Sequence, residues 1–545
     1  AGQTLIMGGL TFTAPVAMTA AEAAAAFSNL VQNAAFAAPA TIAAGDTQSG
    51  GAASKGTYTG AFTGWTSGAA VGDTVVFTST APNSNPADLA NTGTGAVTVT
   101  TTTGAVHNAG ASGGVMGVAT GVVDITGGAA LANVTVDGYA AAAANQVQGA
   151  TNTALATVNL SNGGNFTVAS AASALALNLT NVNGTVAVTA GTTTLNATVN
   201  GTGTATLTSG SATSVKVGGA GNVAGVAGVG LAVATAIDTT AMTAGTAAFT
   251  LNSTAATYAG GAGADRVTFS NATAATKALD LGAGNDTLVF AAVTAVPGVV
   301  LKGGAGDDTI SLVAANAVTL SGSTAFAAQL DSFERLEVTG ATGAQAIDLG
   351  KLGFTNHVTV VGVGGAGTLT LTDLANNGTV VLTADVANGV TAAIKDAATG
   401  TADVLNVQMV KDGVLAGGLL TAANVETVNL AVTDPVTSNG IATHTLTLTA
   451  DKATSVNVTG NAGLTLTMTG STKVTSIDGS AMTAGGLTVK SLNTTAATTI
   501  KGGAGADVLT AATGTTADVL EGGAGNDVLV GNAGLSTLTG GAGND

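Results

Sequence analysis

Six glycine-rich segments that end in aspartate carry the clearest chemistry in this sequence. Each follows the pattern Gly-Gly-x-Gly-x-Asp, except that Leu281 replaces the first glycine of the second segment. Wherever the chain continues, an apolar residue stands two positions after the aspartate. The six segments are 260–265, 281–286, 303–308, 502–507, 522–527 and 540–545. This shared pattern is too specific to be a by-product of the high glycine content.

The six segments have the residue types of a calcium site. Glycine allows a tight turn whose backbone carbonyl oxygens point toward a cation, and aspartate adds a hard carboxylate oxygen. Ca²⁺ fits such a turn better than Mg²⁺, because it accepts six or more oxygens at flexible distances. We therefore predict Ca²⁺ as the cofactor. The predicted ligands are Gly260, Ala262, Asp265, Leu281, Ala283, Asp286, Gly303, Ala305, Asp308, Gly502, Ala504, Asp507, Gly522, Ala524, Asp527, Gly540, Ala542 and Asp545.

The spacing of the aspartates predicts how the sites are arranged. Successive motif aspartates are 21 and 22 residues apart in the first cluster, and 20 and 18 residues apart in the second. In a parallel β-roll such spacings put the motif turns of a cluster on one edge, with the degenerate Asp518 and the Ser-bearing turn 531–536 on the other. We predict one row of ions per cluster, with about two ions in each. Without metal the aligned carboxylates would repel one another, so calcium binding should contribute to folding.

The composition outside the motifs indicates repetitive β structure. The 545 residues include 80 glycines, 6 prolines and no cysteine, and only 8% are charged. Abundant Thr and Val suit a pleated surface. The absence of cysteine excludes disulfides and thiolate metal sites. A net charge of −17 argues against nucleic-acid binding, which needs clustered Lys and Arg.

The sequence contains an internal duplication with an offset of 240 to 241 residues. Segment 212–217 recurs at 453–458, and 237–245 recurs at 477–485. Both copies then continue into Gly-Gly-Ala-Gly-Ala-Asp. Because 464–469 alternates strictly between apolar and polar residues, we predict β structure rather than a transmembrane segment in its apolar counterpart, 223–237.

The N-terminal end has a different character. Alternation at 5–13 around two glycines predicts a β-hairpin, and a capping-box pattern predicts a helix at about 20–33. Residues 60–77 indicate a further strand pair, with Trp65 as a core anchor.

These patterns predict a mainly β fold. Parallel β-helix or β-roll segments would alternate with other β-rich domains, beside a small N-terminal β/α module. The predicted domains are the N-terminal module at 1–80, a charge-poor β-rich domain at 81–237, the first calcium cluster at 238–325, a β-rich domain at 326–490 and the second calcium cluster at 491–545, which we expect to be truncated at its C-terminus.

The hexapeptide turns resemble those of the RTX family, whose members are exported from Gram-negative bacteria by type I secretion. The Ala/Thr/Gly-rich β stretches and the segments 333–338 and 425–430 look like the calcium-dependent S-layer proteins of that group. The similarity is clear over 212–545 and weaker in the N-terminal module. It implies folding triggered by Ca²⁺ outside the cell and assembly into a two-dimensional lattice on the cell surface. It also implies a C-terminal secretion signal, which is not seen in this sequence.

Two other functions stay open. An RTX adhesin or biofilm-matrix protein would carry the same turns, although such adhesins usually repeat a domain many times and only one duplication is visible here. A secreted enzyme with RTX repeats is the less favoured alternative. His107, His357 and His444 are isolated, and 110–114 matches Gly-x-Ser-x-Gly without the flanking strand and helix of a nucleophile elbow. We predict no catalytic residues. The expected partners are other copies of the chain, with cell-surface polysaccharide as a further candidate.

Overall fold

The computed structural model describes residues 151–545 apart from 227–229, 232, 293–294, 343 and 366. The stretches described before residue 151 are 4–7, 10–14, 27, 57–60, 65–69, 77–79, 115–117, 123–126, 131–139 and 145–148. The chain forms two compact units, Ala1–Ala212 and Thr213–Asp545. As the sequence predicts, the fold is mainly β with very little helix. The helix predicted at about 20–33 lies outside the described residues, apart from residue 27.

The N-terminal end contains small antiparallel sheets. Strands β1 (Thr4–Met7) and β2 (Leu10–Thr13) form the predicted hairpin, and β3 (Thr57–Gly60) pairs with β2. Strands β4 (Trp65–Ser67) and β5 (Phe77–Ser79) form the second predicted pair.

The later part of the first unit is a parallel β-solenoid, in which the chain alternates between two sheets. One sheet has the order β6, β8, β10, β12, β14 and the other β7, β9, β11, β13, β15. Side chains alternate between the core and the surface, so that β12 buries Leu175, Leu177 and Leu179. The strands are β6 (Val115–Gly117), β7 (Asp124–Thr126), β8 (Asn133–Asp137), β9 (Gln146–Gln148), β10 (Thr157–Ser161), β11 (Phe166–Ala169), β12 (Ala174–Thr180), β13 (Gly184–Thr189), β14 (Thr194–Asn200) and β15 (Thr204–Ser209).

The second unit is a parallel solenoid built from three sheets. The early sheet contains β16 (Ser214–Gly219), β18 (Ala236–Met242), β20 (Thr257–Ala259), β22 (Leu279–Asp280), β24 (Leu301–Lys302) and β26 (Leu330–Asp331). The late sheet contains β28 (Gln345–Asp348), β30 (Leu369–Leu374), β32 (Val390–Ile394), β34 (Ala416–Thr421), β36 (Thr443–Thr449), β38 (Gly463–Met468), β40 (Leu487–Lys490), β42 (Val508–Thr510) and β44 (Val528–Val530).

The third sheet, which we call the shared sheet, runs the length of the second unit. Its strands alternate along the chain first with those of the early sheet and then with those of the late sheet. The shared sheet contains β17 (Asn222–Val226), β19 (Ala247–Leu251), β21 (Arg266–Phe269), β23 (Thr287–Phe290), β25 (Thr309–Val313), β27 (Arg335–Thr342), β29 (His357–Gly364), β31 (Thr379–Val386), β33 (Val404–Val410), β35 (Thr427–Thr433), β37 (Ser455–Gly460), β39 (Ser476–Met482), β41 (Thr499–Lys501), β43 (Val519–Ala524) and β45 (Thr537–Ala542). Since all its strands are parallel, they begin at one edge, the start edge, and finish at the other, the end edge.

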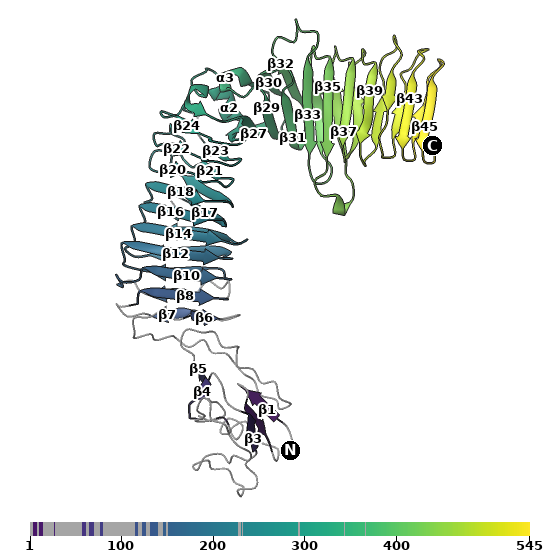
Figure 1. Ribbon diagram of the computed structural model, residues 1–545. Helices are drawn as coiled ribbons and strands as arrows, with labels where there is room; N and C mark the ends of the chain where they lie inside the picture. Colours follow the sequence, from purple (N-terminus) through teal and green to yellow (C-terminus); the bar gives the residue numbers. More distant parts are fainter. Residues whose placement is uncertain are drawn as a thin grey trace. The chain divides into compact units, whose positions relative to one another are not determined.

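The shared sheet changes its partner near the middle of the second unit. The early sheet finishes with β26, the late sheet begins with β28, and β25, β27 and β29 carry the shared sheet across without a break. Figure 1 shows α2 (Ala314–Leu320) and α3 (Leu349–Leu352) at this place. The short helices η2 (Ala327–Gln329) and η3 (Thr437–Asn439) complete the helical content of the described residues.

The alternating Thr and Leu residues explain why these segments form solenoid strands. Leu446 and Leu448 of β36 and Leu464 and Leu466 of β38 are buried, while their Thr neighbours face outward. The β-branched Thr side chains suit a strand whose outer face is hydrated. Asn side chains also stack from turn to turn, as in the hydrogen bond from Asn457 Nδ2 to Asn429 Oδ1 (2.8 Å).

The duplicated segments have the same local structure, but they lie in different sheets. Both have a register shift, after Lys216 in β16 and after Asn457 in β37. The copies β16 and β18 belong to the early sheet, whereas β37 and β39 belong to the shared sheet. The second copy therefore enters the solenoid half a turn out of phase with the first. The 223–237 segment is a strand at its beginning, β17, and its last residues start β18.

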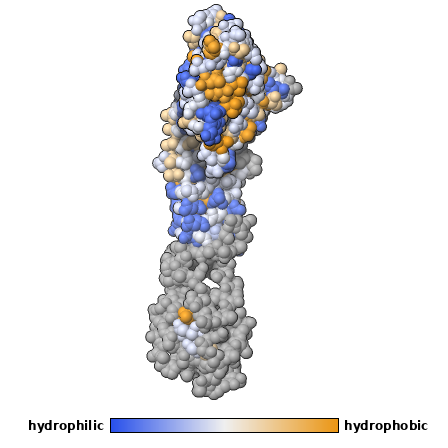
Figure 2. Space-filling model, turned by 90° about the vertical axis from the view of Figure 1, so that its right-hand side faces the viewer, coloured by the Kyte–Doolittle hydropathy of each residue, from blue (hydrophilic) through white to orange (hydrophobic). Residues whose placement is uncertain are grey.

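Apolar side chains gather on the last strands of the second unit, which Figure 2 views directly. The exposed ones are Val528, Val530, Leu535 and Leu538, the side chains that another solenoid turn would cover. None of the helices in the described part of the chain has the length and apolarity needed to cross a membrane.

Candidate calcium site

The first three motif turns lie one above another at the start edge of the shared sheet. Segment 260–265 connects β20 to β21, 281–286 connects β22 to β23, and 303–308 connects β24 to β25. Because β21, β23 and β25 are neighbours in register, the three turns stack directly. We call them the first row.

The last three motif turns stack at the end edge of the shared sheet. Segment 502–507 follows β41, while 522–527 and 540–545 begin in the final residues of β43 and β45. These turns form the second row. Each cluster thus occupies a single edge, as the spacing predicts, but the two rows lie on opposite edges of one sheet. The half-turn offset between the duplicated copies is the cause.

The aspartates of the first row form a ladder of backbone-to-carboxylate hydrogen bonds. The amide of Asp265 donates to Asp286 Oδ1 (2.6 Å), and the amide of Asp286 donates to Asp308 Oδ1 (2.8 Å). Glu334 continues the ladder, since its Oε2 accepts from the Asp308 amide at 2.8 Å. Each carboxylate is therefore oriented by the turn before it.

The second row has the same construction. The amide of Asp507 donates to Asp527 Oδ1 (2.9 Å), and the amide of Asp527 donates to Asp545 Oδ1 (3.0 Å). At the beginning of the row, Asp507 Oδ1 accepts from the amide of Leu487. Its counterpart in the first row, Asp265 Oδ1, accepts from the amide of Ala247.

The second carboxylate oxygens are buried without a hydrogen-bond partner at several rungs. This is so for Oδ2 of Asp286, Asp308 and Asp527, whose residues are at most 4% exposed. An ionised oxygen buried without a partner is strongly unfavourable. A hard cation is the ligand that such oxygens need, so the residues present fit Ca²⁺.

The first glycine of a motif leaves open the space where these oxygens meet. A Cβ atom on Gly303 would stand 2.6 Å from Asp308 Oδ2 and would overlap the carbonyl oxygen of Ser332 in the next turn. A Cβ atom on Gly522 would overlap Asp527 Oδ2 and meet the Gly540 carbonyl oxygen at 2.5 Å. A carboxylate from one turn and a carbonyl from the next therefore converge beside the glycine, as a cation held between turns requires.

The remaining predicted ligands take part in the same stacking. The carbonyl oxygen of Leu281 lies beside Gly260, as that of Gly522 lies beside Gly502. At the third motif position the alanine amides donate to the preceding turn: Ala262 to Met242, Ala283 to Gly261, Ala305 to Gly282, Ala504 to Met482 and Ala524 to Gly503. The carbonyl oxygens of Ala305 and Ala542 accept from Gly284 and Gly525.

Burial and mutual repulsion make these carboxyl groups hard to ionise without a metal. Burial is the main cause that raises the pKa of Asp286 to about 7, and the neighbouring charges of Asp265 and Asp308 contribute to the same rise. Burial likewise raises the pKa of Asp265, Asp308 and Asp507. Bound Ca²⁺ would supply the missing opposite charge, and the metal ligand must be the deprotonated form.

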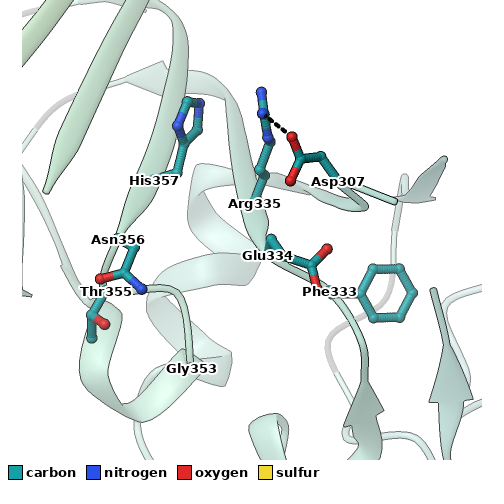
Figure 3. A pocket seen from close by; sticks show the side chains of 8 residues that line it. All are labelled: Asp307, Phe333, Glu334, Arg335, Gly353, Thr355, Asn356 and His357. Atoms are coloured by element: carbon teal, nitrogen blue, oxygen red, sulfur yellow. Dashed lines mark hydrogen bonds and ion pairs between the residues drawn. The ribbon is translucent and has the colours of Figure 1, made fainter. Parts of the chain in front are cut away.

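The first row is bounded by polar groups at both ends. Tyr258 Oη donates to Asp265 Oδ2 at 2.7 Å, which satisfies that oxygen in the absence of metal. At the other end, Arg335 pairs with Asp307 at 2.6 Å beside an open pocket of about 400 Å³. Figure 3 shows this pair in the same pocket as Glu334, with His357 on the neighbouring strand.

The opposite edge of the second cluster is satisfied without metal. Asp518 is fully buried, and its two carboxylate oxygens accept from the Thr498 amide and the Asn532 side chain, each at 2.8 Å. The Ser536 hydroxyl in turn donates to Asn532 Oδ1. A closed hydrogen-bond network thus occupies the degenerate turns.

Sequence reasoning missed Glu334, because no glycine-rich motif precedes it. The signal was its position, directly before a shared-sheet strand, which the fold alone reveals. Among the described residues, no three or more His, Cys, Asp or Glu side chains come together as a group that could hold a metal ion. A site built from single carboxylates and backbone carbonyls does not produce such a group.

Comparison with known protein families identifies these turns. The RTX calcium-binding nonapeptide repeat (4 copies) matches residues 300–312, 494–515 and 513–545. The matches include the third turn of the first row and the whole second row. The chain thus carries RTX repeats, and Ca²⁺ is their ligand. Such repeats are typical of secreted proteins. No curated protein matches the chain.

Proposed function

We propose that this protein is a structural surface-layer protein of a Gram-negative bacterium, exported by type I secretion, which folds and assembles into a two-dimensional lattice when it binds Ca²⁺. The observation that carries the proposal is the position of the calcium rows. They lie at solenoid corners, where the carboxylate of one turn accepts a hydrogen bond from the backbone of the turn before it. Ions held there join turns together, which is a structural task.

The surface composition supports assembly. Residues 138–237 contain a single charged side chain, Lys216. The described strands of this stretch are solenoid strands with Thr, Ser and Asn on their outer faces. A neutral polar surface of this kind has no like-charge repulsion to oppose packing between copies.

Electron microscopy of the purified chain with and without Ca²⁺ tests the proposal. We expect ordered sheets in Ca²⁺ and none after chelation with EGTA. The Gly522→Ala variant, which fills one cation space, should form fewer sheets than Gly531→Ala, whose added Cβ would be 3.4 Å from its nearest neighbour. Dispersed monomers in Ca²⁺ would contradict the lattice and favour an RTX adhesin or matrix protein.

The residues of the described pocket give little support to the alternative of a secreted enzyme. Asp307 is engaged by Arg335, and Glu334 accepts from the Asp308 amide. Outside the pocket, His444 is fully buried, with Nδ1 accepting from the Leu415 amide. These side chains have structural partners instead of a free nucleophile and base. Segment 110–114, with the Gly-x-Ser-x-Gly match, lies outside the described residues.

A further inference from the structure

We propose a further Ca²⁺ site outside the glycine-rich motifs, between the turns that carry Asp403 and Glu426. The site requires only that the chain bind Ca²⁺, so it stands apart from the proposed lattice. Asp403 directly precedes β33 and Glu426 directly precedes β35, and these strands are neighbours in the shared sheet. Both residues therefore lie on the start edge, the edge of the first row.

The pair repeats the geometry with which the first row ends. The Asp403 amide donates to Glu426 Oε2 at 2.8 Å, the distance from the Asp308 amide to Glu334 Oε2. In return, the Asp403 carbonyl accepts from the amides of Glu426 (3.1 Å) and Thr427 (3.0 Å). The Asp308 carbonyl accepts likewise from the two residues at the corresponding positions, at 3.0 and 2.9 Å.

The backbone before each glutamate is also the same. Ser332, two residues before Glu334, has a φ of 56°, and Asn424, two residues before Glu426, has a φ of 62°. Both residues are in the left-handed region, which turns the chain sharply at the corner. A shared corner conformation and shared hydrogen bonds make Asp403–Glu426 a structural copy of Asp308–Glu334.

One oxygen of the Asp403 carboxylate is buried without a hydrogen-bond partner. Its residue is 5% exposed, and Oδ2 is buried without a hydrogen bond, as in Asp286, Asp308 and Asp527 of the RTX rows. Oδ2 lies against Gly400, where a Cβ atom would overlap it. Glycine thus keeps space open beside the orphaned oxygen, three residues before the aspartate instead of five.

No protein charge compensates the pair. In the described part of the chain neither Asp403 nor Glu426 belongs to an ion pair. Asp518, further along the same edge, provides the contrast, because the side chain of Asn532 satisfies its second oxygen. A hard divalent cation would satisfy the second oxygen of Asp403, as the Asn532 side chain satisfies that of Asp518. Carboxylate oxygens are the ligands that Ca²⁺ prefers.

The site would fasten the part of the solenoid that has no RTX motif. The first row ends at Glu334 and the second begins at Asp507, and β33 and β35 lie between them along the shared sheet. Binding there would make the stability of 397–433 depend on calcium.

Hydrogen exchange of the whole chain, measured by mass spectrometry during a Ca²⁺ titration, tests the site. In the wild type we expect amides of 403–433 to become protected as Ca²⁺ is added. Glu426→Gln keeps an oxygen for the Asp403 amide and removes one charge, so it should fold and need at least about tenfold more Ca²⁺ for local protection. Asp403→Asn should abolish the local response and reduce the bound Ca²⁺ by one ion per chain.

Asp412→Asn is the matched control. It removes one exposed carboxylate beyond the other end of β33, and its calcium response should equal that of the wild type. The proposed site would be refuted if protection of 403–433 in the wild type did not depend on Ca²⁺. It would also be refuted if Glu426→Gln needed no more Ca²⁺ than the wild type. The RTX turns serve as internal reference, since their response in the same samples reports separately on RTX calcium binding.

Discussion

At the scale of single residues, the buried carboxyl groups make the metal-free first row sensitive to pH. The pKa of Asp286 is raised from its ordinary 3.8 to about 7, so the folded state favours the protonated form. The corresponding stabilisation is complete below pH 3.8 and is lost as the pH rises through 7. In EGTA we therefore expect amides of β21, β23 and β25 to be better protected at pH 5 than at pH 8, when each exchange rate is compared with the intrinsic rate at the same pH.

The order should reverse when calcium is present. Ca²⁺ binds the deprotonated carboxylate, so the protection that calcium adds should grow between pH 5 and pH 8. The Asp286→Asn variant has no titrating group at this position, so its protection should depend less on pH, both in EGTA and in Ca²⁺. Some pH dependence should remain, because Asp265 and Asp308 still ionise. Equal pH dependence in Asp286→Asn and the wild type would show that Asp286 does not control the effect.

A second residue-scale prediction concerns the glycine that borders each cation space. Gly303→Ala would place a methyl group between Asp308 Oδ2 and the carbonyl of Ser332. We expect weaker calcium binding in the first row and a loss of about 1–3 kcal/mol in the free energy of unfolding in Ca²⁺, the usual range for overpacking. Calorimetry and denaturant titration would measure these effects.

Gly298→Ala is the control for this substitution, at the opposite corner of the same turn. The nearest atom to its Cβ would be the Ala275 carbonyl oxygen at 3.5 Å, an ordinary contact. We expect its stability to change by less than about 0.5 kcal/mol. If the two alanine variants behave alike, the space beside Gly303 is not a cation site.

At the scale of elements, the sequence predicts the calcium turns and their grouping on single edges. It does so because glycine, aspartate and their spacing act locally. The opposite placement of the two rows depends on a nonlocal feature, because the second copy begins an odd number of strands after the first, at β37 instead of β16. The exchange of the early sheet for the late sheet at β26 and β28 leaves no comparable signal. Glu334, Asp403 and Glu426 escape prediction for the same reason, since only the stacking of turns brings them into the carboxylate ladders.

The shared sheet also changes how the predicted regions are connected. The boundaries expected at 325 and 490 both fall within its unbroken ladder, which passes from β25 to β27 and from β39 to β41. Composition distinguishes calcium-rich from calcium-poor turns, but the backbone pairing is the same in both.

At the scale of the whole molecule, we expect the two units to differ in their need for calcium. In the described solenoid of the first unit, neutral side chains serve at several corners: the Asn145 side chain accepts from the Val123 amide, and the Asn165 side chain accepts from the Thr185 amide. Amide side chains satisfy backbone groups without charge repulsion. In the second unit, the corresponding positions of the RTX rows are carboxylates that require a cation.

Chelation should therefore loosen the molecule unevenly. In EGTA at pH 8 we expect hydrogen exchange to accelerate strongly in β21–β25 and β41–β45, while β10–β14 keep most of their protection. The reason is that the RTX rows then contain buried, mutually repelling carboxylates, whereas β10–β14 bury apolar side chains. Mg²⁺ at the same concentration is the control and should restore little protection, because it gives up its water reluctantly. Uniform loss of protection along the chain would contradict this division. Unchanged protection in β21–β25 would show that the first row folds without calcium.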